Sequence, residues 1–207
     1  MFRNNRAGVA GTLVVFALVQ PTFAEHKFPD YPTHRASDCA VKAERAGLLI
    51  GIQPMEDRNE QKYYFNTELT PKGFVPVYMV LENSSSGDSF LFDKTTVKYG
   101  LAGPGGPRPK TLSVGNIAAV DSIALAANLM LPLAGAIFAF AVFSKANDVQ
   151  RNILRNEVQS KTLSPGISMN GFLYVPVPKK GPRQKVRLQV PITRAGKDET
   201  TVLEFDF

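Results

Sequence analysis

Polar and apolar residues alternate along this chain in two groups of short strand-like segments, separated by one long apolar stretch. These segments are rich in β-branched and aromatic residues and are bounded by Pro, Gly and Asn clusters. They lie at 46–53, 74–81, 89–93, 95–99, 169–175, 184–191 and 200–207. About seven short strands of this kind predict a mainly β protein, an immunoglobulin-like antiparallel β-sandwich, interrupted by a long hydrophobic, Ala-rich helical insertion.

The same pattern predicts the organisation of the chain. The polar stretch 56–62 is expected to be a loop, and Pro76 is expected at a sheet edge or bulge because it lacks a backbone N–H. The terminal Phe207 is expected to contact the core. The predicted segments are a signal peptide at 1–24, an irregular N-terminal arm at 25–45, the first half of the sandwich at 46–100, a Gly/Pro linker at 101–116, the helical insertion at 117–161 and the second half of the sandwich at 162–207.

The insertion contains a possible membrane segment. Residues 122–144 carry no charge, and as a helix they would extend about 34 Å, which is long enough to cross a bilayer core of about 30 Å. Asn128 and Pro132 reduce the gain from insertion. Beyond Lys145 the pattern becomes amphipathic, with one apolar face predicted to hold Val149, Ile153, Leu154 and Val158.

Two topologies fit this hydropathy. In one, residues 122–144 cross the membrane once and residues 145–207 lie in the cytoplasm. In the other, the segment breaks at Pro132 into a hairpin that returns the chain to the same side and lies in a membrane or against another copy. We favour the hairpin, because three isolated strands make a poor domain. The small residues expected to support close helix packing, together with the break, are Ala124, Ala127, Pro132, Gly135 and Ala139.

The N-terminus is typical of a secretory signal peptide. Arg3 and Arg6 precede an apolar stretch at 7–19, and small residues at Thr22 and Ala24 predict cleavage after Ala24. Cleavage would lower the net charge from +6 to +4, because only Arg3 and Arg6 are lost. That charge is small and scattered, so a nucleic-acid partner is not expected.

Residues able to perform chemistry are scarce. The single Cys39 excludes an intrachain disulfide and is predicted to be a free thiol or to form an intermolecular disulfide. Both histidines, His26 and His34, lie in the Pro-containing arm, where the neighbouring Asp30 and Asp38 are not expected to complete a metal site. No nucleophile-elbow, zinc-protease or phosphate-loop motif is present. We therefore expect no catalytic residues, no cofactor and no metal.

Six short motifs resemble those of a group of uncharacterised exported proteins of Gram-negative bacteria, many of them lipoproteins. In chain order these motifs are Tyr64–Leu69, Gly73–Val77, Val80–Asn83, Lys145–Asn147, Leu163–Gly166 and Gly171–Tyr174. The resemblance covers most of the chain after Ala24 and implies an envelope β-sandwich with a small-residue-rich helical insertion. It implies no activity. Cys39 does not follow an apolar block, so the acyl anchor of the lipoprotein members is not expected here.

Together these features predict a non-enzymatic protein of the cell envelope. We expect a periplasm-facing, membrane-associated sandwich that binds or scaffolds a protein partner or a second copy. The alternatives are the single-pass topology with residues 145–207 in the cytoplasm, and a periplasmic small-ligand binder or enzyme, since sandwiches often carry sites on loops.

Overall fold

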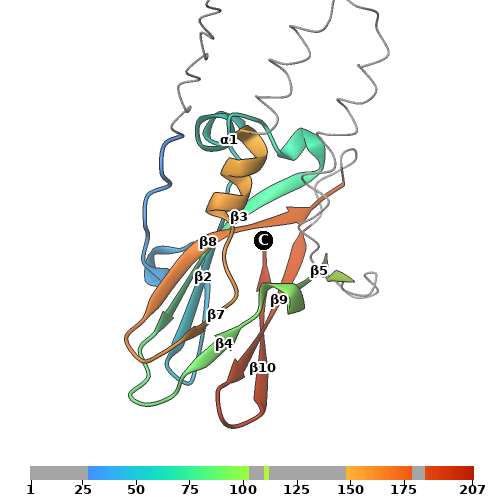
Figure 1. The fold of residues 1–207 in the computed structure, drawn as a ribbon. Coiled ribbons are helices and arrows are strands. Elements are labelled where there is room, and N and C mark those ends of the chain that lie inside the picture. The colour runs from blue at the N-terminus through green and yellow to red at the C-terminus, as the bar shows by residue number, and fades with distance from the viewer. Residues whose placement is uncertain (1–27, 103–109, 112–147, 179–184) are drawn as a thin grey trace, which may run out of the picture.

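Two antiparallel sheets form the described part of the chain, which comprises residues 28–102, 110–111, 148–178 and 185–207 of this computed structural model (Figure 1). The four-stranded sheet has the order β1 (Val41–Arg45), β2 (Leu48–Pro54), β3 (Phe74–Asn83) and β8 (Ser168–Pro176). The six-stranded sheet has the order β6 (Lys110–Thr111), β5 (Lys98–Leu101), β9 (Val186–Arg194), β4 (Phe90–Phe92) and β7 (Lys161–Leu163), and β10 (Glu199–Asp206) also pairs with β9. The prediction of a mainly β protein is confirmed.

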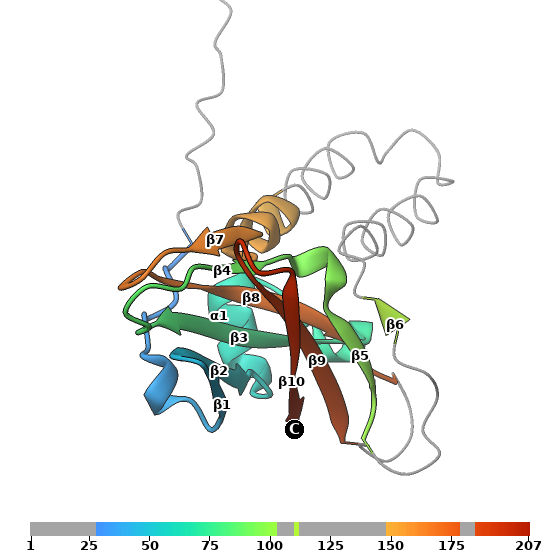
Figure 2. The same cartoon turned by 90° about the horizontal axis from the view of Figure 1, so that it is seen from below.

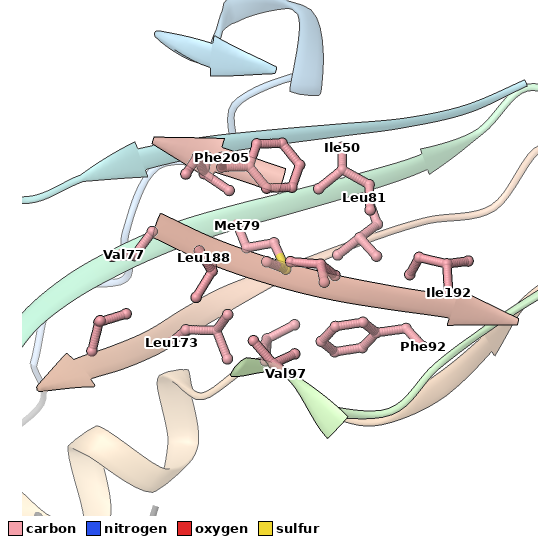
Figure 3. Packing of buried hydrophobic residues seen from close by; sticks show 14 of the residues in the cluster. Ile50, Val77, Met79, Leu81, Phe92, Val97, Leu173, Leu188, Ile192 and Phe205 are labelled. Atoms are coloured by element: carbon pink, nitrogen blue, oxygen red, sulfur yellow. The ribbon is translucent and has the colours of Figure 1, made fainter. Parts of the chain in front are cut away.

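The two sheets enclose one hydrophobic core, shown in Figure 3. Strand β9 alternates strictly, because Val186, Leu188, Val190 and Ile192 are buried while the residues between them are half-buried. Phe205 of β10 is 1% exposed, and Phe207 packs against the same core, as expected.

Strand β3 and most of β8, in the four-stranded sheet, are buried on both faces. In β3, Val77, Met79 and Leu81 face the shared core, whereas Tyr78 and Val80 belong to a second cluster on the other face. This explains why β3 reads as a nearly continuous apolar run rather than as an alternating one. Figure 2 shows α1 on the face of this sheet that lies away from β9 and β10.

The short helix α1 (Arg58–Phe65) corrects one prediction, because its first five residues belong to the stretch expected to be a loop. Asp57 caps its N-terminus by accepting hydrogen bonds from the backbone N–H groups of Asn59 and Glu60. Asn66 ends the helix in a left-handed conformation with φ 54°. Of the eight residues of α1, only Gln61 and Phe65 are buried. The helix therefore has too few apolar positions to show a helical period in the sequence.

Two other boundaries and one buried position differ from the prediction. Val41–Arg45 of the expected irregular arm forms β1, and Lys110–Thr111 of the expected linker forms β6. Helical residues 148–156 bury Val149 and Ile153 as predicted, but Leu154 is 46% exposed and Asn152 is buried instead. Short single-turn elements complete the fold, namely η1 (Ala36–Asp38), η2 (Thr70–Lys72) and η3 (Lys94–Thr96).

Two prolines lie in the interior of strands that pair on both sides, namely Pro76 in β3 and Pro191 in β9. Pro76 does not lie at the expected sheet edge, because β3 is a central strand. The Pro76 carbonyl accepts from the Met55 N–H at 2.8 Å, just beyond the last pair of β2 and β3, and the Met55 carbonyl accepts from the Gln61 amide instead of from a backbone N–H at Pro76. Val186 and Phe207 exchange both of their backbone hydrogen bonds, so the even-numbered residues of β9 direct their N–H and C=O groups toward β10. The odd-numbered residues, Pro191 among them, direct theirs to the other side. Pro191 therefore faces the gap between β5, which pairs as far as Gln189, and β4, which pairs from Ile192.

Strands from before and after the insertion pair directly with each other. β3 pairs with β8, from Phe74 opposite Pro176 to Glu82 opposite Ser168, and β4 and β5 both pair with β9. The signal-peptide prediction at 1–24 and the possible membrane segment at 122–144 lie outside the described residues. Within the described ranges, no helix has the length and apolar character needed to cross a bilayer.

Candidate functional site

The outer face of the four-stranded sheet carries a covering layer, which we define as the arm at 28–38, α1 and helical residues 148–156. The layer is held together by polar contacts between its parts. Asn152 donates a hydrogen bond to the backbone carbonyl of Tyr64 in α1, and the Arg155 guanidinium lies 3.4 Å from the Asp30 carboxylate in the arm. From the sheet, the Tyr174 hydroxyl donates to the Ile153 carbonyl at 2.9 Å.

Tyr31 anchors the arm to this face. Its ring centroid lies 4.6 Å from that of Tyr78 in β3 and 4.9 Å from that of Phe172 in β8. It also lies 4.8 Å from Tyr64 in α1, in an edge-to-face arrangement. One side chain thus links the arm, the helix and two strands.

The tyrosine hydroxyls of this cluster are poorly suited to acid–base catalysis. Burial, with a smaller contribution from Glu60, raises the pKa of Tyr31 to about 12. Burial also raises the pKa of Tyr78, whose hydroxyl has no hydrogen-bond partner within the described chain, although the nearby His34 backbone offsets part of the rise. Phenols of this kind stay protonated at neutral pH and make poor general bases.

Gln61 fixes the loop that follows α1. Its amide nitrogen donates to the Met55 carbonyl at 2.8 Å and to the Thr70 hydroxyl at 2.7 Å. Its amide oxygen accepts from the backbone N–H groups of Leu69 at 2.8 Å and Thr70 at 3.0 Å. A fully buried amide with all four hydrogen bonds made is a structural element, and it leaves no free group for a ligand.

A buried ion pair lies where the chain passes from the covering layer to the six-stranded sheet. The Lys94 ammonium is 2.8 Å from Oε2 of Glu157, whose side chain is 3% exposed. The other oxygen, Oε1, has no hydrogen-bond partner among the described residues. The next residue, Val158, donates its backbone N–H to the Phe172 carbonyl, so the pair sits at the junction of the two sheets.

A shallow cleft opens between the edges of the two sheets, at β1 and β10. It is small and open to solvent. Arg194 in its wall is occupied by Asp88 at 3.5 Å and Glu199 at 3.3 Å, whereas Arg45 makes no ion pair within the described ranges. The remaining lining residues are Ala46, Leu48, Phe90, Ile192, Thr201 and Leu203.

Of the arm residues considered as metal ligands, His26 lies outside the described residues, and the other three have separate partners. Asp30 pairs with Arg155, His34 packs against the Tyr31 ring at 5.6 Å, and Asp38 accepts a hydrogen bond from Ser37. Among the residues that the structure describes, no three His, Cys, Asp or Glu side chains are grouped so as to hold a metal ion.

Cys39 is free and buried, with 3% exposure. Burial, and to a lesser degree Asp38 and Glu82, raises the pKa of its thiol, so the reactive thiolate is disfavoured at neutral pH. Of the two predictions for this residue, the free thiol therefore agrees with its environment.

The residues predicted to form sites lie outside the described ranges: Ala24 at the cleavage position, and Ala124, Ala127, Pro132, Gly135 and Ala139 in the insertion. The sequence did not reveal the covering layer or the Lys94–Glu157 pair. Tyr31, Tyr64 and Tyr78 follow no local period, and Lys94 and Glu157 are 63 residues apart. Two parts of the layer had a local signal: the amphipathic pattern predicted helical residues 148–156, and Asp57, a helix-capping residue before a run of helix formers, marks the start of α1.

No protein-family model, curated protein or solved structure matches this chain.

Proposed function

We propose that this protein is a non-enzymatic component of the cell envelope. Its two sheets form a periplasm-facing, immunoglobulin-like β-sandwich that binds or scaffolds a partner, and residues 122–144 attach it to a membrane or to a second copy. One observation carries the proposal: strands from before and after the insertion pair in the same sheets.

This pairing bears on topology. A single crossing by residues 122–144 would place β3 and β8 on opposite sides of the membrane, and would separate β4 and β5 from β9. The exposed edges would then carry rows of unpaired backbone groups. The alternative with residues 145–207 in the cytoplasm therefore demands loss of both sheets, whereas a hairpin or a segment that does not cross leaves them intact.

The chemistry of the described residues supports a binding rather than a catalytic role. The tyrosines of the covering layer stay protonated at neutral pH, the thiol of Cys39 is buried, and the amide of Gln61 is saturated by hydrogen bonds. The immunoglobulin-like classification is supported by the two antiparallel sheets around one core.

A reporter fusion combined with fractionation tests the proposal. Alkaline phosphatase, which is active only in the periplasm, is fused after Phe207 of the full chain. We expect activity, and we expect the protein to resist carbonate and to be extracted by detergent. A matched variant with Ala127→Asp and Ala134→Asp should be released by carbonate, because each charge opposes insertion by about 3 kcal/mol. An inactive reporter on a stable fusion would contradict the proposal and favour the single-pass alternative.

A second candidate, binding of a small acidic ligand, is favoured by the cleft, which is lined by Leu48, Phe90 and Arg45, a residue without an ion pair among those that the structure describes. Hexanoate and benzoate serve as probes in a thermal-shift titration of the full chain in detergent. This candidate predicts stabilisation that Arg45→Gln abolishes. Equal shifts in both proteins, or none, would dismiss it.

A further inference from the structure

We propose that the end of the molecule formed by α1 and by the start of helical residues 148–156 rests on the lipid bilayer, with Tyr63 in the interfacial region. The inference rests on the proposed function, since it takes residues 122–144 to be associated with a membrane. Beyond that function, it specifies which surface of the protein faces the lipid and which side chain makes the contact.

The lengths of chain outside the described ranges place this end near the membrane. Residue 148 follows the last uncharged residue, Ser144, by four residues, which span at most about 14 Å when extended. The Arg155 guanidinium donates to the Phe28 carbonyl at 3.5 Å, so the start of the arm is held at the same end of the molecule as helical residues 148–156.

Helix α1 is attached directly to this end. Asn152 bonds the carbonyl of Tyr64, and it lies four residues, or about 6 Å of helix, beyond residue 148. Figure 1 shows α1 beside helical residues 148–156, at the end opposite the turn between β9 and β10. A membrane segment ending at Ser144 would therefore hold Tyr63 close to the bilayer surface.

The side chains exposed at this end suit a lipid interface. Tyr63 is 63% exposed, more than any other large hydrophobic residue in the described ranges. Tyrosine is enriched at the boundary between hydrocarbon and water, where its ring and hydroxyl meet different surroundings. The Tyr63 ring packs edge-to-face on that of Tyr64 at 4.9 Å and leaves its outer face open to the surroundings.

Two ion pairs at this end have the cation more exposed than the anion, whereas the Arg155–Asp30 pair has the reverse order. Lys62 is 61% exposed while its partner Glu68, at 2.6 Å, is 25% exposed. Arg151 is 70% exposed while its partner Asp148 is 30% exposed. Basic groups at the periphery can reach lipid phosphates while their acidic partners stay against the protein.

The experiment uses the absence of tryptophan from the chain. Tyr63→Trp and the control Val202→Trp, on the distant strand β10, each introduce a single fluorophore at an exposed site. Each full-length protein is reconstituted into phosphatidylcholine–phosphatidylglycerol vesicles with and without brominated acyl chains. Flotation of the vesicles measures membrane association independently of fluorescence.

We expect both proteins to float, and brominated lipid to quench about half of the fluorescence of Tyr63→Trp while leaving Val202→Trp unchanged. Floating protein with equal, weak quenching at both positions would overturn the inference alone. A blue-shifted but unquenched Tyr63→Trp would also overturn it, since a second copy would then cover the site. Protein that stays with the soluble fraction would overturn the membrane association itself, and the inference with it.

Discussion

The Lys94–Glu157 pair allows a quantitative test of how the two sheets are joined. Replacing Lys94 by Met keeps most of the apolar stem but removes the ammonium that lies 2.8 Å from Glu157. The carboxylate, with a side chain only 3% exposed and with Oε1 already lacking a partner, would then be buried and unpaired. Leaving a buried charge uncompensated is strongly destabilising.

The expected magnitude follows from this burial. Breaking a buried pair costs about 3–5 kcal/mol, and because the Lys94 side chain is 23% exposed, water can partly replace it, so we expect about 2–3 kcal/mol. With a urea dependence of about 2 kcal/mol per M, the unfolding midpoint should fall by about 1–1.5 M. The measurement is urea unfolding of the full chain in mild detergent, followed by the β-sheet circular dichroism signal.

Two further variants make the test decisive. The double variant Lys94→Met/Glu157→Leu removes both charges and should unfold near the wild-type midpoint, because replacement of a buried pair by apolar residues is often neutral. Lys62→Met breaks a similar short pair with Glu68 at the surface and should shift the midpoint much less than Lys94→Met. If Lys94→Met and Lys62→Met gave the same small shift, the pair would not be buried as described, and the reasoning would fail.

Three other predictions follow from the described contacts. Gly171→Ala should lower the free energy of unfolding by about 1–3 kcal/mol, because the new Cβ would lie 2.6 Å from Cα and N of Val158. Gly87→Ala is the control and should have little effect, since the space around Gly87 is open. Urea unfolding measures both. Burial raises the pKa of Tyr31 from 10.0 to about 12, so as the pH rises the Tyr31 hydroxyl loses its proton in the unfolded chain before it does so in the folded protein. The contribution of Tyr31 to the free energy of unfolding is therefore complete below pH 10 and falls as the pH rises toward 12. Tyr31→Phe should flatten this alkaline loss in melting curves, and an unchanged curve would contradict the assignment. Cys39 should react with a thiol reagent far more slowly in the folded protein than in urea, since it is buried with a raised pKa; equal rates would show that the site opens readily.

The strand predictions worked where one face of a strand is polar. In β9 and β10, apolar residues face the core and Arg187, Gln189, Glu204 and Asp206 face outward, so a period of two is visible along the chain. The second half of the sandwich was therefore placed within a few residues of the observed strands.

The predictions failed where contacts between distant segments set the structure. α1 forms on one capping residue and two buried side chains, which is too little for a periodic signal. In helical residues 148–156, Asn152 is buried and Leu154 is exposed, the reverse of the apolar pattern. Asn152 can be buried because it donates a hydrogen bond to the Tyr64 carbonyl, and the residues next to it in the sequence give no sign of that distant partner.

The order of polar and apolar residues was sufficient to show that the chain forms many short antiparallel strands and carries one long uncharged segment between them. Such patterns arise from local burial, and burial on one face of a strand repeats every two residues. The order could not show that β3 is covered on both faces, that Tyr31 holds the arm against it, or that Lys94 meets Glu157. Those features depend on segments brought together by chain folding, and contact free energies between distant residues leave no regular trace in the sequence.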